Sequence, residues 1–164
     1  MILLRKGRST ANYTFWVTAD GDLSAGFGAG GTMHTVTSTT PVDDGAWHHA
    51  ALVMGTELSL FVDGDLEDSA SGLPASADTN GADLVLGDVL SPVTGTLFAG
   101  AIDELHISST TRYGAGSFVP ERHATADSET LALWHFDEGS GYVALDSGPD
   151  GLVAGVIGCA WVAE

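Results

Sequence analysis

The amino-acid sequence predicts an all-β protein, an antiparallel sandwich of two sheets. Apolar residues alternate with polar ones over short runs, and turn residues interrupt these runs about every eight to twelve positions. The 22 glycines, many of them beside an aspartate, supply the positive backbone φ angles that tight hairpins require. No stretch has the apolar period of an amphipathic helix.

The alternating runs place the strands along the chain. They are predicted at residues 2–6, 13–18, 22–27, 32–38, 47–54, 57–63, 83–86, 101–108, 131–136, 151–157 and 160–162. The Ser-, Ala- and Gly-rich stretch 69–82 is predicted to be a long surface loop. We expect one sandwich domain over 1–164, with a main body at 1–109, an irregular connection at 110–130 that can hold a short helical turn, and completing strands at 131–164.

The charge of the chain limits its partners. It carries 22 acidic and five basic residues, for a net charge of -17, and beyond residue 8 its only Lys or Arg residues are Arg112 and Arg122. No basic face can therefore bind nucleic acid or anionic lipid. No stretch is long and apolar enough to insert into a membrane. Cations, neutral sugars and protein surfaces remain as partners, although acidity alone is also typical of a merely soluble surface.

Four runs resemble one known family, in its order and spacing. Residues 44–53 and 58–64 resemble the central hairpin of laminin G-like and pentraxin-like domains, residues 84–87 resemble the next strand, and residues 98–107 resemble the closing strand. The resemblance implies the concanavalin A-like jelly roll, in which two curved antiparallel sheets form the sandwich.

The C-terminal part resembles the opening of the same family. Residues 131–141, followed by 146–148, are similar to a segment that comes first in ordinary members. Three arrangements are open: a circular permutation, completion of a neighbour's sheet in an oligomer, or a fragment of a tandem array. An unpaired apolar edge invites association, so a homodimer through an edge or a sheet face is one expectation.

A calcium site is expected at the closing strand. Strict alternation places Asp103 on the face of the apolar residues that follow it, and a buried carboxylate needs a hydrogen bond, a cation or a metal. The resemblance implies a structural calcium held by Asp103 with Asp137, Glu138 and Asp146. The alternative is that Asp103 caps backbone N–H groups and that the other carboxylates are solvated turn residues.

The sequence offers no arrangement for catalysis. Adjacent His48 and His49 must face opposite sides of a strand and cannot chelate one metal, and the other histidines lie in unrelated contexts. Glycoside hydrolysis is a remote alternative, because the family that this sequence resembles shares its jelly roll with glucanases. Those enzymes carry their paired carboxylates in an alternating Glu-x-Asp-x-Glu pattern on one strand. Here Asp103 and Glu104 are neighbours and lack the flanking glutamates. We predict that the protein is not an enzyme.

Aromatic side chains are the candidates for ligand contact. Tyr113 and Tyr142 lie in predicted loops and are our ligand-binding candidates, with a lid over the core as the alternative role. Tryptophans can stack on sugar rings, but all four lie in strand patterns, and the resemblance implies core positions for Trp47 and Trp134.

The predicted function is non-catalytic recognition of a carbohydrate or a protein surface, with calcium as a structural or bridging ion. The alternative is a structural, adhesive or dimerising module without a small ligand. Relatives of this kind are usually extracellular. Residues 1–6 do not form a secretion signal, so the compartment stays open.

Overall fold

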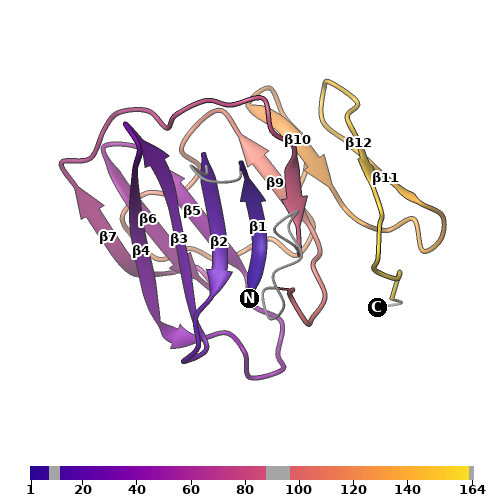
Figure 1. Cartoon of the computed structure of the whole chain (residues 1–164), viewed down its shortest axis with the longest axis horizontal. Helices are drawn as coiled ribbons and strands as arrows, with labels where there is room; N and C mark the ends of the chain where they lie inside the picture. Colours follow the sequence, from indigo (N-terminus) through magenta and orange to yellow (C-terminus); the bar gives the residue numbers. More distant parts are fainter. Residues whose placement is uncertain (8–11, 88–96, 163–164) are drawn as a thin grey trace. The chain divides into compact units, whose positions relative to one another are not determined.

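The computed structural model describes residues 1–7, 12–87 and 97–162, and all regular structure in them is β-strand (Figure 1). This part of the chain contains no helix that is long and apolar enough to cross a bilayer. The strands are β1 (Ile2–Lys6), β2 (Tyr13–Val17), β3 (Asp22–Ala29), β4 (Thr32–Pro41), β5 (Ala50–Met54), β6 (Glu57–Val62), β7 (Asp65–Ser71), β8 (Leu84–Leu86), β9 (Leu105–Ser108), β10 (Thr130–Trp134), β11 (Val143–Leu145) and β12 (Val153–Gly155).

The chain divides into two compact units, each made of two stretches of sequence. The first unit comprises Met1–Ala99 and Tyr113–Pro120, and the second comprises Gly100–Arg112 and Glu121–Glu164. In the first unit, one antiparallel sheet has the strand order β4-β3-β2-β1-β8 and the other has the order β5-β6-β7 (Figure 1). The prediction of an all-β, two-sheet sandwich is confirmed.

The core of the first unit lies between these two sheets. Every second residue of β3 and of β6 points inward, as the pleat of a strand requires. Burying each large apolar side chain there contributes about 1.5–3 kcal/mol. The central members are Leu23, Ala25, Phe27, Val36, Leu58, Leu60 and Val62.

Carboxylates of β7 close one edge of the sandwich. Glu67 accepts hydrogen bonds from the backbone N–H and the hydroxyl of both Thr39 and Thr40, over 2.6–3.1 Å. Asp68 accepts the N–H of Thr37 at 2.9 Å. These bonds satisfy edge groups of β4 that would otherwise be open to pairing with another chain.

The second unit consists of two small antiparallel sheets. Strand β9 pairs with β10, strand β11 pairs with β12, and an isolated bridge joins Trp134 to Asp146. Its buried apolar residues include Ala132, Leu133, Trp134 and Ala144.

Several predicted boundaries are wrong. Strand β7 was not predicted, and its last residues, 69–71, begin the stretch that was expected to be a loop. Strand β11 was also missed, while residues 160–162 form no strand and residues 110–129 form no helical turn. The predicted strand 101–108 begins only at Leu105, because Glu104 has a φ of 51°, which interrupts the extended backbone.

Candidate binding site

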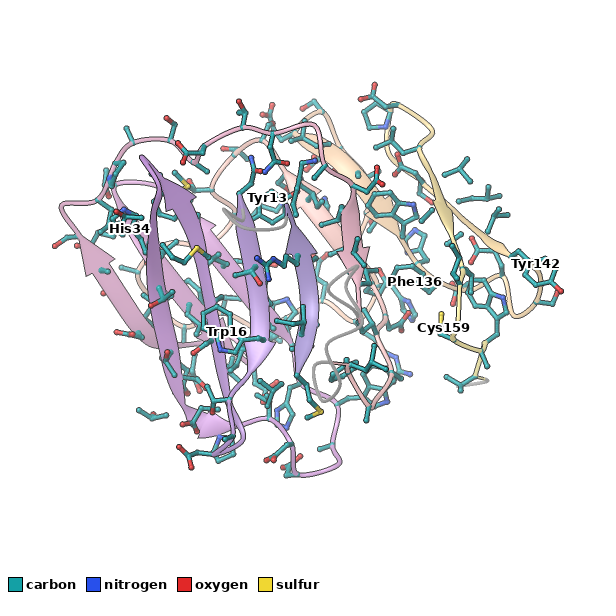
Figure 2. The ribbon with its side chains drawn as sticks, viewed as in Figure 1. Tyr13, Trp16, His34, Phe136, Tyr142 and Cys159 are labelled. Atoms are coloured by element: carbon teal, nitrogen blue, oxygen red, sulfur yellow. The ribbon has the colours of Figure 1, made fainter. Side chains whose placement is uncertain are left out.

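Trp47 lies on the loop between β4 and β5 and exposes 66% of its surface. The predicted core position for Trp47 is wrong, because β5 begins at Ala50 and strand alternation does not extend back to the indole. Trp134 is buried as expected, whereas Trp16, on β2 in Figure 2, is half-buried. An exposed indole on a loop offers a flat apolar surface to a ligand.

One histidine between two carboxylates braces the loop 42–49. His48 lies 3.0 Å from the Asp44 carboxylate through Nε2 and 2.8 Å from the Asp63 carboxylate through Nδ1. The Asp44 carboxylate also accepts the N–H of Ala46 at 2.8 Å. The backbone is therefore fixed on both sides of Trp47.

Asp63 holds its place because it forms a tight turn with the next residue. Asp63 and Gly64 have φ angles of 54° and 88°, as in the two-residue hairpin turns that suit twisted strands. The Asp63 carboxylate accepts the N–H of His49 at 2.8 Å. A Cβ on Gly64 would lie 1.9 Å from the carbonyl oxygen of Phe118, so only glycine fits there.

The other end of the loop 42–49 is anchored on Gly21. The N–H of Val42 donates to the carbonyl of Gly21 at 2.8 Å, and a Cβ on Gly21 would lie 2.2 Å from the carboxylate of Asp43. Asp43 and Asp44 are both exposed, so two carboxylates precede the indole on the same loop. Carboxylate oxygens beside an aromatic face suit sugar hydroxyls or a cationic side chain.

His48 and His49 lie in opposite electrostatic surroundings. The hydrogen bond to Asp63, together with that to Asp44, raises the pKa of His48. Burial lowers the pKa of His49, whose Nδ1 is buried without a partner among the described residues. Both histidines precede β5, which begins at Ala50, so the strand alternation that was predicted to place them on opposite faces does not apply here.

Tyr113 packs inside the first unit rather than projecting from it. Its ring stacks on Phe118 with centroids 3.7 Å apart, and both rings meet His49 and Phe61 edge-on. These ring contacts are compatible with the lid role, the alternative that the sequence left open for Tyr113. Tyr142, by contrast, is 84% exposed and points away from the strands of the second unit in Figure 2.

Backbone N–H groups engage two of the predicted calcium ligands, Asp146 and Glu138. Asp146 accepts the backbone N–H groups of Leu133, Gly148 and Leu152 at 2.6–3.1 Å. Burial alone would raise the pKa of Asp146, but these three bonds lower it. Asp146 thus stabilises a turn of the second unit. The lone pairs that accept these three hydrogen bonds are the ones that a cation would need.

Glu138 keeps one buried oxygen without a donor. Its Oε1 accepts the N–H of Leu145 at 2.7 Å, while its Oε2 is buried and has no partner among the described residues. Asp137 is exposed, and Asp103 is half-buried before the start of β9. Within the described ranges, no group of three or more His, Cys, Asp or Glu side chains is arranged to hold a metal ion.

Glu104 unites two histidines that the sequence placed in unrelated contexts. Its carboxylate lies 2.9 Å from Nδ1 of His135 and 3.2 Å from Nδ1 of His123, and it accepts the N–H of Ala124 at 3.0 Å. Burial opposes the ionised form, but these hydrogen bonds lower the pKa of Glu104. No sequence signal predicts this cluster, because its members are 19 and 31 positions apart.

Comparison with known families fits the two-sheet architecture of the first unit. A family model described as the concanavalin A-like lectin/glucanases superfamily matches residues 1–115. The chain belongs to this superfamily. The resemblance to laminin G-like domains is thereby confirmed, and such domains in general bind carbohydrate or protein partners without catalysing a reaction. No curated protein and no solved structure matches the chain.

Proposed function

We propose that this chain is a non-catalytic binding module that recognises carbohydrate at the loop 42–49. The exposed indole of Trp47, held between two braced ends of that loop, is the observation that carries the proposal. A sugar ring can stack on the indole while its hydroxyls donate to the Asp43 or Asp44 carboxylate. Because the loop is already fixed, binding orders few groups, which favours affinity.

A glycan array tests this proposal. We expect neutral polysaccharides to bind the wild-type chain, Trp47→Ala to abolish the signal, and Trp47→Phe to retain part of it. Met33→Ala is the matched control, because Met33 is also an exposed apolar residue of the first unit but lies on β4. A signal that Trp47→Ala leaves unchanged would contradict the proposal, as would a glycan array without any signal.

The absence of catalysis is part of the same proposal. Glycoside hydrolysis needs a pair of carboxylates that project together into one cleft. Asp103 and Glu104 are neighbours in sequence, and Glu104 is engaged by His135, His123 and a backbone N–H. Release of reducing ends from any polysaccharide that binds the chain would overturn this part.

We also propose that a calcium ion binds through Glu138, with backbone and water oxygens completing its shell. The support is the buried Glu138 Oε2, which has no donor among the described residues, and the neighbouring carboxylate of Asp137. Asp146 fits this role poorly because three backbone N–H groups engage it.

Thermal unfolding with calcium and with a chelator tests the ion. A ligand that binds only the folded chain raises the unfolding midpoint, and Glu138→Gln should remove that increase. Equal midpoints in the two buffers would contradict a stabilising calcium.

The alternative function is an adhesive or dimerising module. Two short sheets in the second unit leave strand edges that another chain could pair with. A glycan array without signal, combined with concentration-dependent association in light scattering, would favour this function over carbohydrate recognition.

A further inference from the structure

The hairpin formed by β11 and β12 has its side chains in an inverted arrangement. Val143 and Leu145 of β11 are 45% and 57% exposed, and Val153 of β12, which pairs with Leu145, is 63% exposed. The intervening Ala144 is completely buried. The hairpin therefore turns its smallest side chain inward and its large apolar side chains outward, opposite to the usual pattern of a half-buried strand.

The exposed apolar surface continues beyond the strands. Tyr142, Leu152 and Ile157, which flank the hairpin, are 84%, 47% and 90% exposed. Single exposed apolar residues are ordinary, but a cluster on one hairpin marks an interaction surface. We call the residues Val143, Leu145 and Val153 the hairpin face.

The charges around the hairpin face indicate what can cover it. No Lys or Arg occurs between residues 123 and 164, whereas Asp137 and Asp150 are exposed close to the hairpin in sequence. A complementary surface needs an apolar centre with lysine or arginine at its rim. A second copy of this chain is a poor complement, because it carries 22 acidic and only five basic residues.

We propose that the hairpin face docks a protein segment in which apolar and basic side chains alternate. Such a segment, when extended, presents its apolar side chains to Val143, Leu145 and Val153 and keeps a cation near Asp150, in the connection between β11 and β12. This surface lies in the second unit and is independent of the carbohydrate site proposed at Trp47.

Three synthetic octapeptides test the proposal by isothermal titration with the full chain. They alternate leucine with lysine, serine with lysine, and leucine with glutamate. We expect only the leucine–lysine peptide to bind, and we expect its affinity to fall when the ionic strength rises from about 0.05 to about 0.5 M.

The variant V143T/L145T/V153T should weaken that binding by about tenfold or more, because it keeps β-forming residues but removes the apolar contacts. Met33→Thr and Val119→Thr, which alter exposed apolar residues of the first unit, should have no effect. If the triple variant does not fold, as judged by circular dichroism, Val153→Thr alone replaces it.

Three outcomes would overturn the proposal. Equal binding of the two lysine peptides would mean that charge alone attracts them. Equal affinity of the wild-type chain and the hairpin-face variant would place binding elsewhere. A dimer in light scattering that the hairpin-face variant abolishes would make a second copy the occupant.

Discussion

The first and the second unit are each stabilised internally by a different kind of interaction. The first unit has a continuous apolar core between two sheets, and its carboxylates bond mainly at edges and turns. The second unit buries fewer large side chains and fixes its segments through carboxylates, with Asp146 on three backbone N–H groups and Glu104 on two histidines. The comparison teaches that the second unit should depend on its charge state far more than the first.

The largest effect is expected at the turn that closes β6 and β7 in the first unit. Gly64→Ala combines a φ of 88° with a methyl group 1.9 Å from a carbonyl oxygen. We expect the free energy of unfolding in urea to fall by about 3 kcal/mol or more. Gly72→Ala, at a φ of 70° with open space around it, should lose only about 1–2 kcal/mol. Equal losses in the two variants would show that the backbone at Phe118 moves aside and relieves the clash.

The next effect is expected in the second unit. Asp146→Ala leaves three backbone N–H groups without their acceptor, and we expect a loss of about 2 kcal/mol in urea unfolding. Asp150→Ala, which removes an exposed carboxylate nearby in sequence, should change stability by less than about 0.5 kcal/mol. If the two substitutions had the same effect, the hydrogen bonds to Asp146 would not be important for the stability of this unit.

Acid should destabilise the second unit before the first. The pKa values of Asp146, Glu104 and Asp127 are all lowered in the folded chain, the last by a bidentate pair with Arg112. Their contribution is complete above the unfolded pKa values of about 4 and is lost as the pH falls further. Glu67 and Asp44 of the first unit also have lowered pKa values, but they bond to an edge strand and a loop and not to the core. Amide signals of β10 should therefore broaden before those of β3 and β6 in an NMR titration. Simultaneous broadening of the signals of β10, β3 and β6 would contradict the idea that the second unit depends more on its charge state than the first.

The smallest effect is expected at His48. Its pKa is raised, so its stabilising contribution is present below the unfolded value of about 6.5 and is lost as the pH rises through the folded value. His48→Gln should flatten this part of the pH–stability curve measured by thermal unfolding. Burial shifts His49 the other way, so His49→Gln should instead reduce the stability that the wild-type chain loses on acidification. An unchanged pH–stability curve in the His48→Gln variant would show that the interaction of His48 with Asp44 and Asp63 does not contribute to stability.

Local alternation was sufficient to predict most of the first unit. Strand β1 was predicted with its observed bounds, because Gly7 follows it directly, and the Asp63–Gly64 turn is one of the aspartate–glycine pairs from which tight hairpins were expected. Strand β7 was missed, because its Ser-, Asp- and Glu-rich composition is set by its bonds to β4 and not by burial. Bonds of that kind depend on a distant strand, which no local pattern reports.

The candidate site was less predictable than the fold. The exposure of Trp47 depends on where β5 begins, and the contacts of Glu104 depend on how segments far apart in sequence meet. The predicted calcium ligands were chosen by resemblance, which does not report that backbone N–H groups engage the Asp146 carboxylate.

The division of the chain has a consequence for how the protein can be dissected. The polypeptide passes into the second unit after Ala99, returns at Tyr113 and leaves again after Pro120. No single scission can release either unit intact, and removal of everything after residue 130 would strip β9 of its antiparallel neighbour. A protease acting at one exposed bond between β9 and β10 would leave these two strands on different fragments of one sheet, so a sample nicked there should separate only under denaturing conditions.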